Sequence, residues 1–553
     1  MLECLSMEVN VLIGGPAGEG VGRTSHLLGK AIVEAGGFVF NYRDYPSLIR
    51  GGHNFNILKI SDQPVSSHEW QVDLIVAFDQ QTIDLHQKER KEKGIIIASS
   101  QFESSSLVGI DLAGILQKLE AKKVVGNNIF LGVIFKALSL SFESLRAVLK
   151  KEFKSSMVVL AAKAGYDLSV SSVAEFKFEK EKERFFLTGN EAIAAGALQG
   201  GLETYFAYPM TPATAVLGFL QKAQKETGVK AIQLENEIAV ANAALGASFA
   251  GNVSMLGTSG GGLGLMAEAL SLQGMSELPL VAYLSQRAGP STGVPTYTSQ
   301  GDLNFALNIG HGEFPRLVVA PGDVKEAYER TQEALYLAMK YRSLVILLGD
   351  KHLGENEYVA DELKDLGLKS LPADRQGSQE DYSPYRITES GVSPFLPPGQ
   401  GPISRATSYE HDEKGLTTEE SEPTIKMNDK RFRKLKGIEK EVAGLNPVSY
   451  YGNGNGENLI VAWGSTKGAI IDALKDLPDW SFLQISWLSP FPCEAVLEKL
   501  KTARRVVLVE NSATGQLANL ISKEIQFKIK EKILKYDGRP FTVREIVKEL
   551  KNG

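Results

Sequence analysis

Cysteine is nearly absent from this chain of 553 residues, which has two, Cys4 and Cys493. Two thiols exclude a disulfide scaffold, and they are too few to hold an iron–sulfur cluster or a cysteine-rich zinc site on this chain alone. The sequence also lacks a run of eighteen uncharged apolar residues, so it predicts no transmembrane helix and no membrane partner. Its first fifteen residues lack the basic region of a secretory leader. We therefore expect a cytoplasmic protein.

The chain has no excess of positive charge either, because 60 Lys and Arg stand against 66 Asp and Glu, a net charge of −6. A groove that follows a phosphate backbone needs clustered cations, so the balance argues against nucleic acid as a partner. Glycine is instead abundant, at 54 residues. This number favours many tight turns between strands and helices, or close approaches of the backbone to ligands.

Three segments alternate short aliphatic runs with stretches of helical periodicity, a pattern typical of βαβ units. We predict an α/β fold with three parallel-sheet domains at residues 1–182, 188–366 and 457–553. Residues 367–456 are rich in Pro, Gly, Ser and acidic residues and include a basic run from Lys430 to Lys436. They are expected to form a linker or long excursion draped over a neighbouring domain or subunit. The predicted strands are Asn10–Ile13, Phe38–Tyr42, Leu74–Phe78, Ile95–Ala98, Thr204–Ala207, Val253–Leu256, Pro279–Leu284, Arg316–Ala320, Leu344–Leu348, Leu459–Trp463, Ser481–Ile485 and Arg505–Val509.

The clearest predicted helices are Val21–Ala35 and Val324–Lys340, the second with Asp323 as its N-cap. A glycine-rich turn, Gly15–Gly20, precedes the first of them. Backbone amides in such a turn can approach a phosphate. The glycine order GxxGxG differs from the GxGxxG of dinucleotide sites, so a nicotinamide enzyme is the weakest interpretation, and a tight packing turn explains the pattern at least as well.

One motif of the second segment, Tyr208–Thr214, directly follows a predicted strand, where open α/β sheets place their ligand sites. Its two prolines restrict the backbone and hold the Thr211 side chain at the sheet edge. Pro212 also suits the first turn of a following helix, with Thr211 as N-cap. A capping role alone would leave the adjoining Tyr-Pro pair unexplained.

Two further loops of the same segment follow strands. The loop Gly257–Gly264 exposes backbone amides to a ligand or a partner chain. Arg287 has the forked cation suited to a carboxylate, although a structural salt bridge is the common alternative. Glu237 begins a helix of small residues and, taken alone, is typical of a surface acid in a first helical turn. Together these features predict a site for a small carboxylate substrate beside a cofactor.

In chain order, these motifs resemble the α subunit of 2-oxoacid:ferredoxin oxidoreductases. The resemblance lies in TYFAYPMTPAT, the helix of Glu237, TSGGGLGLM and RAGPSTGVPTYTSQGDL. The last segment, with AWGSTKGA, LSPFP, VENSATGQL and YDGRPFT, resembles the family's transketolase-C-terminal-like domain. The strings GGPAGEGVG and YPSLIRGGHN resemble its γ domain, fused here ahead of the α part.

The resemblance implies a thiamine diphosphate enzyme that joins a 2-oxoacid to coenzyme A, releases carbon dioxide and passes two electrons through iron–sulfur clusters to ferredoxin. Glu237 matches the carboxylate that hydrogen-bonds the aminopyrimidine ring, and Glu235 is the less suitable neighbour. Thr211 and Arg287 match the residues that contact the substrate. The other matched positions are Tyr208, Pro209, Thr258, Ser259 and Gly260 for the cofactor, Ser291 and Thr292 for the substrate, and Arg50, Gly51 and Gly52 for coenzyme A.

The sequence also lacks half of what such an enzyme needs. The family holds the diphosphate through Mg²⁺ with a Gly-Asp-Gly motif followed by Asn, and neither Gly349-Asp350-Lys351 nor Asp537-Gly538-Arg539 qualifies. We therefore expect a β subunit to carry Mg²⁺ and the [4Fe-4S] clusters, in an α₂β₂ assembly. Met210 and Ala213 depart from the usual Ile and Ser of the Tyr-Pro motif, but both changes should leave Thr211 in place.

The identity of the 2-oxoacid stays open. The fused γ–α order favours 2-oxoglutarate, with pyruvate or a branched-chain 2-oxoacid as alternatives. A related thiamine-dependent decarboxylase or transketolase-like enzyme would be favoured by a partner chain without cysteines. A scaffold subunit without activity is the alternative from another class, but a scaffold needs none of Glu237, Thr211 and Arg287.

Overall fold

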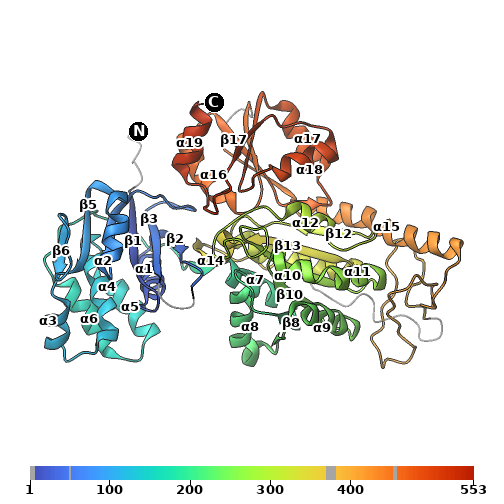
Figure 1. Ribbon diagram of the computed structural model, residues 1–553, viewed down its shortest axis with the longest axis horizontal. Coiled ribbons are helices and arrows are strands. Elements are labelled where there is room, and N and C mark those ends of the chain that lie inside the picture. Colours follow the sequence, from blue (N-terminus) through green and yellow to red (C-terminus); the bar gives the residue numbers. More distant parts are fainter. Residues whose placement is uncertain (1–6, 49–51, 369–381, 453–456, 553) are drawn as a thin grey trace.

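Three β-sheets, of eight, seven and five strands, organise the chain. The computed structural model describes residues 7–48, 52–368, 382–452 and 457–552. Figure 1 shows the sheets in three bodies, blue, green-yellow and red in chain order, with the red body lying above the other two. No helix within these ranges is long and apolar enough to cross a membrane. The α/β fold class predicted from the sequence is confirmed.

The first sheet is mixed, because its first three pairings are parallel and its last four are antiparallel. β2 and β3 follow one another without a crossover helix, which allows only antiparallel pairing, so this half departs from the parallel arrangement that the sequence rhythm indicated. In order across the sheet the strands are β6 (Leu107–Ile110), β5 (Arg90–Ser99), β4 (Val72–Ala77), β1 (Glu8–Pro16), β3 (His53–Ser61), β2 (Phe38–Asp44), β14 (Glu357–Ala360) and β7 (Phe185–Thr188).

Six α-helices of the described residues accompany this sheet. Apolar side chains of five of them share one core with its strands, and Ile83 of the remaining helix belongs to a second core. Val21 begins the first of these helices, as predicted. The helices are α1 (Val21–Glu34), α2 (Gln80–His86), α3 (Leu112–Lys118), α4 (Gly126–Ala137), α5 (Phe142–Glu152) and α6 (Ser156–Tyr166). β14 falls within the second predicted segment but pairs with β2, so the middle of the chain extends this first sheet.

The second sheet is parallel except for its edge strand β18. All five strands predicted in this segment are present, each displaced by at most two residues at an end. In order across the sheet, its seven strands are β18 (Trp487–Ser489), β12 (Arg316–Val319), β13 (Leu344–Asp350), β11 (Leu280–Gln286), β10 (Ser254–Thr258), β8 (Thr204–Ala207) and β9 (Lys230–Gln233). Because neighbouring strands run in the same direction, the carboxyl ends of β9, β8, β10 and β11 meet at one edge.

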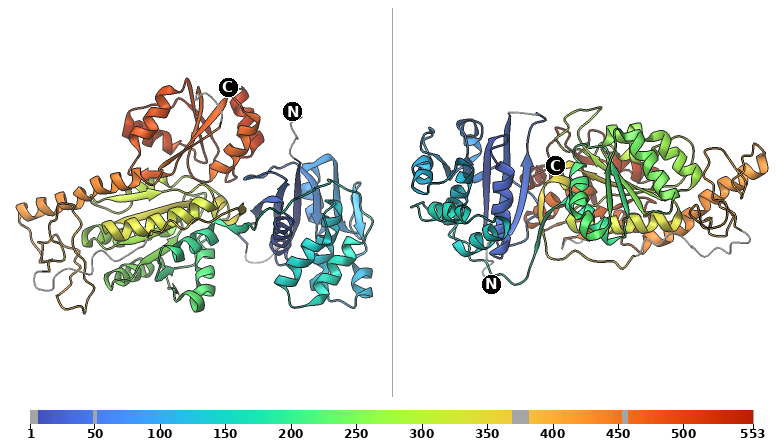
Figure 2. Two further views of the ribbon diagram at one scale, coloured as in Figure 1. Left: turned by 180° about the vertical axis from the view of Figure 1, so that it is seen from behind. Right: turned by 90° about the horizontal axis from the view of Figure 1, so that it is seen from below.

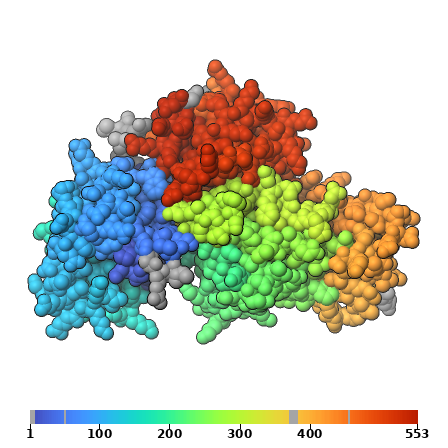
Figure 3. Space-filling view, in the orientation of Figure 1, coloured from blue at the N-terminus to red at the C-terminus, as the bar shows by residue number. Residues whose placement is uncertain are grey.

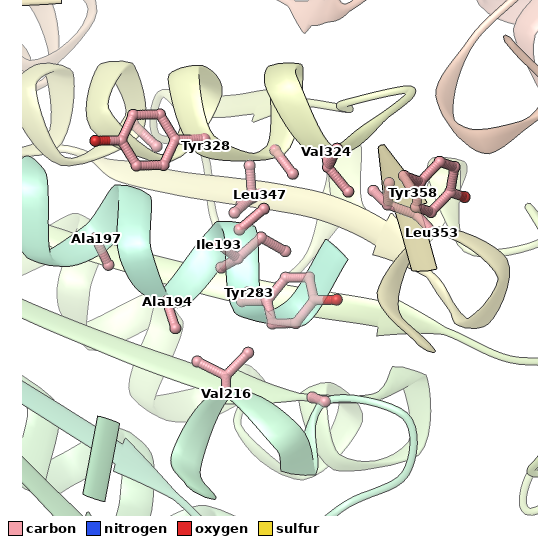
Figure 4. Packing of buried hydrophobic residues seen from close by; sticks show 14 of the residues in the cluster. Ile193, Ala194, Ala197, Val216, Tyr283, Val324, Tyr328, Leu347, Leu353 and Tyr358 are labelled. Carbon is pink, nitrogen blue, oxygen red and sulfur yellow. The ribbon is translucent and has the colours of Figure 1, made fainter. Parts of the chain in front are cut away.

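Helices cover both faces of this sheet, and the predicted N-cap is confirmed, since the Asp323 carboxylate accepts the Glu326 amide at 2.9 Å. Figure 4 shows Ile193 of one helix and Tyr328 of another packed against Tyr283 and Leu347 of the strands. The helices are α7 (Gly189–Gln199), α8 (Thr214–Thr227), α9 (Glu237–Phe249), α10 (Gly260–Leu265), α11 (Ala267–Ser276), α12 (Leu303–Asn308), α13 (Val324–Tyr341) and α14 (Lys351–Glu355).

The third sheet is parallel apart from β15 and includes all three strands predicted for it. In order its strands are β15 (Val448–Tyr451), β17 (Trp480–Ile485), β16 (Asn458–Ala462), β19 (Arg505–Glu510) and β20 (Glu531–Leu534). Its helices are α16 (Lys467–Ala473), α17 (Cys493–Thr502), α18 (Gln516–Ile525) and α19 (Val543–Asn552). β18 leaves this body to join the second sheet, which fastens the two together.

The segment predicted as a linker contains a long helix, α15 (Ser421–Ala443). Its basic run is not a solvated surface, because Lys430 and Lys434 are buried and both pair with Glu277, Lys430 at 2.7 Å. The apolar positions of this helix are few and its buried cations resemble surface charges in sequence, so periodicity could not show it. The turned views show α15 and its neighbouring loops, in orange, extending from the second body (Figure 2).

Candidate active site

Four loops meet at the carboxyl edge of the second sheet. They follow β8, β9, β10 and β11, which are neighbours in the sheet. Each loop begins where a strand ends, so its first residues are held by the sheet hydrogen bonds while its side chains face the same space. The structure therefore brings together the segments that contain Thr211, Glu237, Ser259 and Arg287.

Thr211 and Arg287 are joined directly. The Nη1 atom of Arg287 donates to the Thr211 carbonyl oxygen at 3.0 Å. The adjacent Pro212 carbonyl accepts from Asn190 at 2.9 Å, and Tyr283 in turn donates to Asn190 at 2.9 Å. Asn190 is fully buried, and this chain of hydrogen bonds holds the turn that contains Thr211 and Pro212 against the sheet.

Thr211 does not cap a helix, contrary to the prediction. Helix α8 begins at Thr214, its N-cap position is Ala213, and no side chain caps it. The Met210 carbonyl accepts the Ala213 amide at 2.9 Å, so a turn separates the Tyr-Pro motif from the helix. The Thr211 hydroxyl is consequently not committed to a backbone amide of the helix.

Glu237 is the first residue of α9 and is 5% exposed, whereas Glu235 is exposed. Asn236 caps the helix by accepting the Ala239 amide at 2.9 Å. Within the described residues the Glu237 carboxylate has no hydrogen-bond or ion-pair partner. A buried carboxylate without a partner is costly, so its place at a helix N-terminus beside an open site suits a ligand that donates to it.

The loop after β10 supplies two more polar atoms without partners. The hydroxyl oxygens of Thr258 and Ser259 are buried and make no hydrogen bond. A Cβ at Gly262 would lie 2.0 Å from the Thr258 hydroxyl and 3.0 Å from Cγ of Glu237. Only glycine therefore fits between them, and α10 approaches the carboxylate closely.

A cavity of about 430 Å³ opens beside this edge, between the second body and the third. Among its described lining residues, Arg287 is the single cation and Asp302 the single carboxylate. Burial raises the pKa of Asp302 to about 6, while Arg287 opposes the shift. Burial also lowers the pKa of Arg287, and Asp302 opposes that change. The remaining lining is Ala288, Gly289, Pro290, Thr298, Ser299, Gly301, Ser512, Ala513, Thr514, Gln516, Tyr536 and Gly538.

The third body holds the segment that contains Asp302. The Gln516 side chain donates to the Gly301 carbonyl at 2.6 Å and accepts the Asn304 amide at 2.8 Å. Glu510 organises the turn before Gln516, because its carboxylate accepts the amides of Gln516 and Leu517 at 2.7 and 2.9 Å. The third body thus helps to position the wall of the site.

Among the described lining residues, Arg287 is the one predicted site residue, because Thr211, Glu237, Thr258, Ser259 and Gly260 lie at the neighbouring sheet edge and do not line the cavity. Four further predicted site residues also stand apart from this cavity. Tyr208 is 37% exposed and Pro209 is exposed, and neither lines it. Ser291 and Thr292 are exposed at the tip of a loop closed by a bridge between Ala288 and Val294. An exposed position at the edge of the site suits contact with a partner chain better than enclosure of a small substrate.

The predicted coenzyme A loop is described only in part, since Arg50 and Gly51 lie outside the described residues. Gly52 lines a cavity of about 610 Å³ between the first and third bodies, with Lys88, Lys535 and Arg539 as its cations. A second cavity of about 850 Å³ adjoins the glycine-rich turn of residues 18–20 and contains Arg23, Lys122 and Lys123. Gly18 and Gly20 have φ values of 93° and 83°, which side chains rarely adopt.

The residues at the sheet edge fit the aminopyrimidine end of thiamine diphosphate. That ring offers donors and a flat face, and the edge offers the unpartnered Glu237 carboxylate, two unpartnered hydroxyls and the glycines of α10. The diphosphate end needs a hard metal ion. No group of three or more His, Cys, Asp or Glu side chains in the described part of the chain is placed to hold one.

Comparison with known proteins identifies the family. Residues 195–430 match the family described as pyruvate flavodoxin/ferredoxin oxidoreductase, thiamine diphosphate-binding, and residues 10–168 match pyruvate ferredoxin/flavodoxin oxidoreductase. The 2-oxoacid:ferredoxin oxidoreductase subunit alpha of Saccharolobus solfataricus is 32% identical, over 98% of this chain and 97% of that protein. The chain belongs to the 2-oxoacid:ferredoxin oxidoreductases, as an α subunit.

Two further proteins similar to this α subunit have names that state a substrate. The 2-oxoglutarate synthase subunit KorA of Archaeoglobus fulgidus is 32% identical over 62% of this chain and 91% of that protein. The 2-oxoglutarate:ferredoxin oxidoreductase of Magnetococcus marinus, solved with 2-oxoglutarate, coenzyme A and succinyl-CoA bound, superposes with a TM-score of 0.89 at 28% identity and covers 99% of both chains. The resemblance stated from the motifs is therefore confirmed at the level of the family.

Sequence reasoning on this α subunit missed Asn190, Asp302 and Gln516. Asp302 and Gln516 stand inside quoted motifs, TSQGDL and VENSATGQL, but neither received a role. Asp302 precedes α12, where an acid is ordinarily explained as an N-cap, yet its side chain caps nothing. Asn190 lies within α7, and no local signal marks its contact with a turn more than twenty residues away.

Proposed function

We propose that this α subunit catalyses, with its β subunit, the coenzyme A-dependent oxidative decarboxylation of 2-oxoglutarate and passes the electrons to ferredoxin. The observation that supports the proposal most is the position of Arg287, which lines the cavity, donates to Thr211 and follows a strand of the same sheet edge as the unpartnered Glu237 carboxylate. Similarity to KorA and to the Magnetococcus enzyme favours 2-oxoglutarate. Pyruvate and branched-chain 2-oxoacids are the alternatives, and a non-catalytic scaffold subunit is the alternative outside catalysis.

Each side chain has a distinct task in this proposal. Arg287 binds the substrate carboxylate with the donors that its bond to Thr211 leaves free, including the unpartnered Nε. The Thr211 hydroxyl, free of any capping role, contacts the substrate. Glu237 accepts a hydrogen bond from the aminopyrimidine ring and holds this ring in position. Bound thiamine diphosphate supplies a carbon nucleophile and an electron sink for decarboxylation.

The β subunit supplies the rest of the site. The full sequence has no Gly-Asp-Gly motif and only two cysteines, so Mg²⁺, the diphosphate contacts and the [4Fe-4S] clusters are assigned to the partner. We place the complex in the cytoplasm as an α₂β₂ assembly. Coenzyme A would reach the site from the first body, through the cavity that Gly52 lines or the one beside the glycine-rich turn.

The decisive experiment is anaerobic purification of the native complex through a tag on this chain. Viologen reduction is then followed with thiamine diphosphate, coenzyme A and a panel of 2-oxoacids. We expect reduction that requires coenzyme A and 2-oxoglutarate. Glu237→Gln should lower kcat at least about a hundredfold, because the isosteric amide cannot support the same proton position.

Glu235→Gln is the matched control, because Glu235 lies two residues away and is exposed. Equal losses in both variants would contradict the role of Glu237. Viologen reduction with pyruvate and with no other 2-oxoacid would replace 2-oxoglutarate as the proposed substrate but leave the enzyme class unchanged. Absence of reduction with any 2-oxoacid, together with absence of a co-purifying iron–sulfur protein, would leave the scaffold interpretation.

A further inference from the structure

Among the described residues that line the cavity of Arg287, Asp302 is the one acidic side chain, and the proposed function gives it no role. In the described part of the chain neither of its carboxylate oxygens has a hydrogen-bond or ion-pair partner. Its Oδ2 atom lies 2.5 Å from the point where a Cβ of Gly260 would stand. The carboxylate therefore lies against the loop after β10, close to the predicted cofactor edge, and is only partly exposed.

The backbone around Asp302 is held from two sides. Its amide donates to the Gln286 side chain at 3.0 Å, and Gln286 itself is fully buried and donates to the Gly349 carbonyl at 3.1 Å. Gln516 holds the residues before and after it, Gly301 and Asn304, through the bonds already described. A carboxylate whose backbone is held in this way and whose own oxygens are unpartnered is suited to respond to the charge of a ligand.

We propose that Asp302 couples substrate binding to proton uptake, taking one proton when the 2-oxoacid carboxylate docks on Arg287. This inference rests on the proposed function. Before binding, Arg287 is the sole cation among the described lining residues and partly offsets the Asp302 charge. A docked carboxylate takes over that cation and brings a second negative charge into the same 430 Å³. Two carboxylates then share one cation, and protonation of Asp302 relieves the repulsion.

The titratable groups around Asp302 agree with this coupling. Arg287 faces it from the loop after β11, Glu237 reaches α10 at Gly262, and Tyr536 lines the cavity from the third body. Burial holds the pKa of Asp302 at about 6, against the effect of Arg287, so the free site is mostly ionised at neutral pH. A ligand that neutralises Arg287 raises this pKa, and a proton enters. Release of the carboxylate carbon as CO₂ removes the second charge and returns the proton.

The test counts protons on the intact, anaerobically purified complex. N-oxalylglycine and oxamate replace a carbon beside the keto group of 2-oxoglutarate and pyruvate by nitrogen, so they bind without being decarboxylated. Calorimetric titration at pH 7 in phosphate and in Tris, which differ in ionisation enthalpy, gives the number of protons bound per analogue. We expect about one-half to one proton for the natural complex and close to none for Asp302→Asn.

Glu226→Gln is the control, because Glu226 is an exposed acid on α8 of the same body, and it should leave the count unchanged. The same linkage predicts that log KM of the active 2-oxoacid rises with pH between 6 and 8 in the natural complex and is flat in Asp302→Asn. Asp302→Glu should restore the slope, which a merely structural defect would not allow.

Retention of the full proton count in Asp302→Asn, or no proton uptake and a flat log KM in the natural complex, would overturn the inference. The proposed function is judged separately. A complex that reduces viologen with a 2-oxoacid but binds no proton refutes the coupling alone, whereas absence of reduction with every 2-oxoacid refutes the activity.

Discussion

At the scale of single residues, the site depends on charges and hydroxyls that the protein leaves unpartnered. Glu237, Thr258 and Ser259 are buried at the sheet edge, and each keeps at least one polar atom without a hydrogen bond. Leaving a buried polar atom unpaired costs free energy, so these positions weaken the isolated subunit. The cost is recovered when a ligand supplies the missing donors and acceptors.

Replacement of Arg287 by lysine should impair substrate binding although the charge is kept. The guanidinium donates to the Thr211 carbonyl and still has donors for a carboxylate, whereas an ammonium group cannot form both contacts in that geometry. We expect kcat/KM for the 2-oxoacid to fall about a hundredfold, mainly through KM. The measurement is initial-rate viologen reduction. A Michaelis constant within twofold of the natural value would contradict the assignment.

At the scale of secondary-structure elements, α18 and α15 each stabilise a neighbouring body through polar contacts. The first residue of α18, Gln516, holds the segment that contains Asp302. Helix α15 brings Lys430 and Lys434 to the buried Glu277, whose pKa the two cations hold well below its usual range although burial alone would raise it. Neither role is visible in the helical periodicity of these segments, because both depend on partners distant in sequence.

Removal of the two hydrogen bonds of Gln516 should disturb the site from the third body. In Gln516→Met the side chain keeps its length but can no longer hold Gly301 and Asn304, so the wall of the cavity becomes looser. We expect kcat/KM to fall ten- to a hundredfold with little change in melting temperature. Lys523→Met, on the exposed side of the same helix, is the control and should leave kcat/KM unchanged. Equal activity in the two variants would show that the third body does not position the site.

Loss of the Glu277 carboxylate should release α15. In Glu277→Gln two buried lysines keep their charge without an anion, which costs about 3–5 kcal/mol. Limited trypsin digestion should then cleave within α15, which is rich in Lys and Arg. Glu422→Gln, an exposed acid on that helix, should keep the natural cleavage pattern. Adding Lys430→Met and Lys434→Met to Glu277→Gln should restore resistance, and failure to do so would point to another source of stability.

At the scale of the whole molecule, the three bodies meet through buried polar groups. Asp472 of the third body accepts the Ser66 amide at 2.9 Å and the Ser67 hydroxyl at 2.6 Å from the first. Lys467 of the third body pairs with Glu326 of the second at 2.5 Å. The space-filling view shows the red body seated on both of the others (Figure 3). The cavity that contains Arg287 and the one that Gly52 lines lie along these junctions, so binding there and the packing of the bodies are linked.

The junction between the first and second bodies, where the rings of His68 and His352 lie 6.3 Å apart, should make the stability of the protein sensitive to acid. His68 is fully buried with both ring nitrogens unpartnered, and burial holds its pKa well below 6.5; burial also lowers the pKa of His352 to about 3. Both imidazoles stay neutral in the folded state where the unfolded chain binds protons. Stability is therefore full above about pH 6.5 and falls below it, by about 1.4 kcal/mol per pH unit for each imidazole.

Thermal unfolding of the complex between pH 7.5 and 5 measures this loss. His68→Phe keeps a ring of similar size and removes one titrating group, so the decline of melting temperature below pH 6.5 should become shallower. His311→Phe replaces a histidine whose side chain is 76% exposed and should leave the decline unchanged. An identical decline in the natural complex and in His68→Phe would contradict the argument.

Much of this protein follows from sequence because its signals are local. Alternation of aliphatic runs with helical periodicity predicted the α/β class, the five strands around the site and the N-cap at Asp323, since each depends on neighbours a few residues apart. The strand-end positions of Thr211 and Arg287 predicted that they would meet, because parallel strands end at one edge, whereas Glu237 was predicted only as the start of a helix and the strand before it, β9, was not predicted.

Only the tertiary structure decided the contacts between distant segments. It showed that β14 completes the first sheet, that the supposed linker contains α15 anchored by buried lysines, and that Gln516 of the third body holds Asp302 of the second. A charge at one position looks the same in sequence whether solvent or a distant carboxylate surrounds it. The local pattern therefore determined the elements and the motifs of this α subunit, whereas long-range burial and pairing decided which charged groups are free to act.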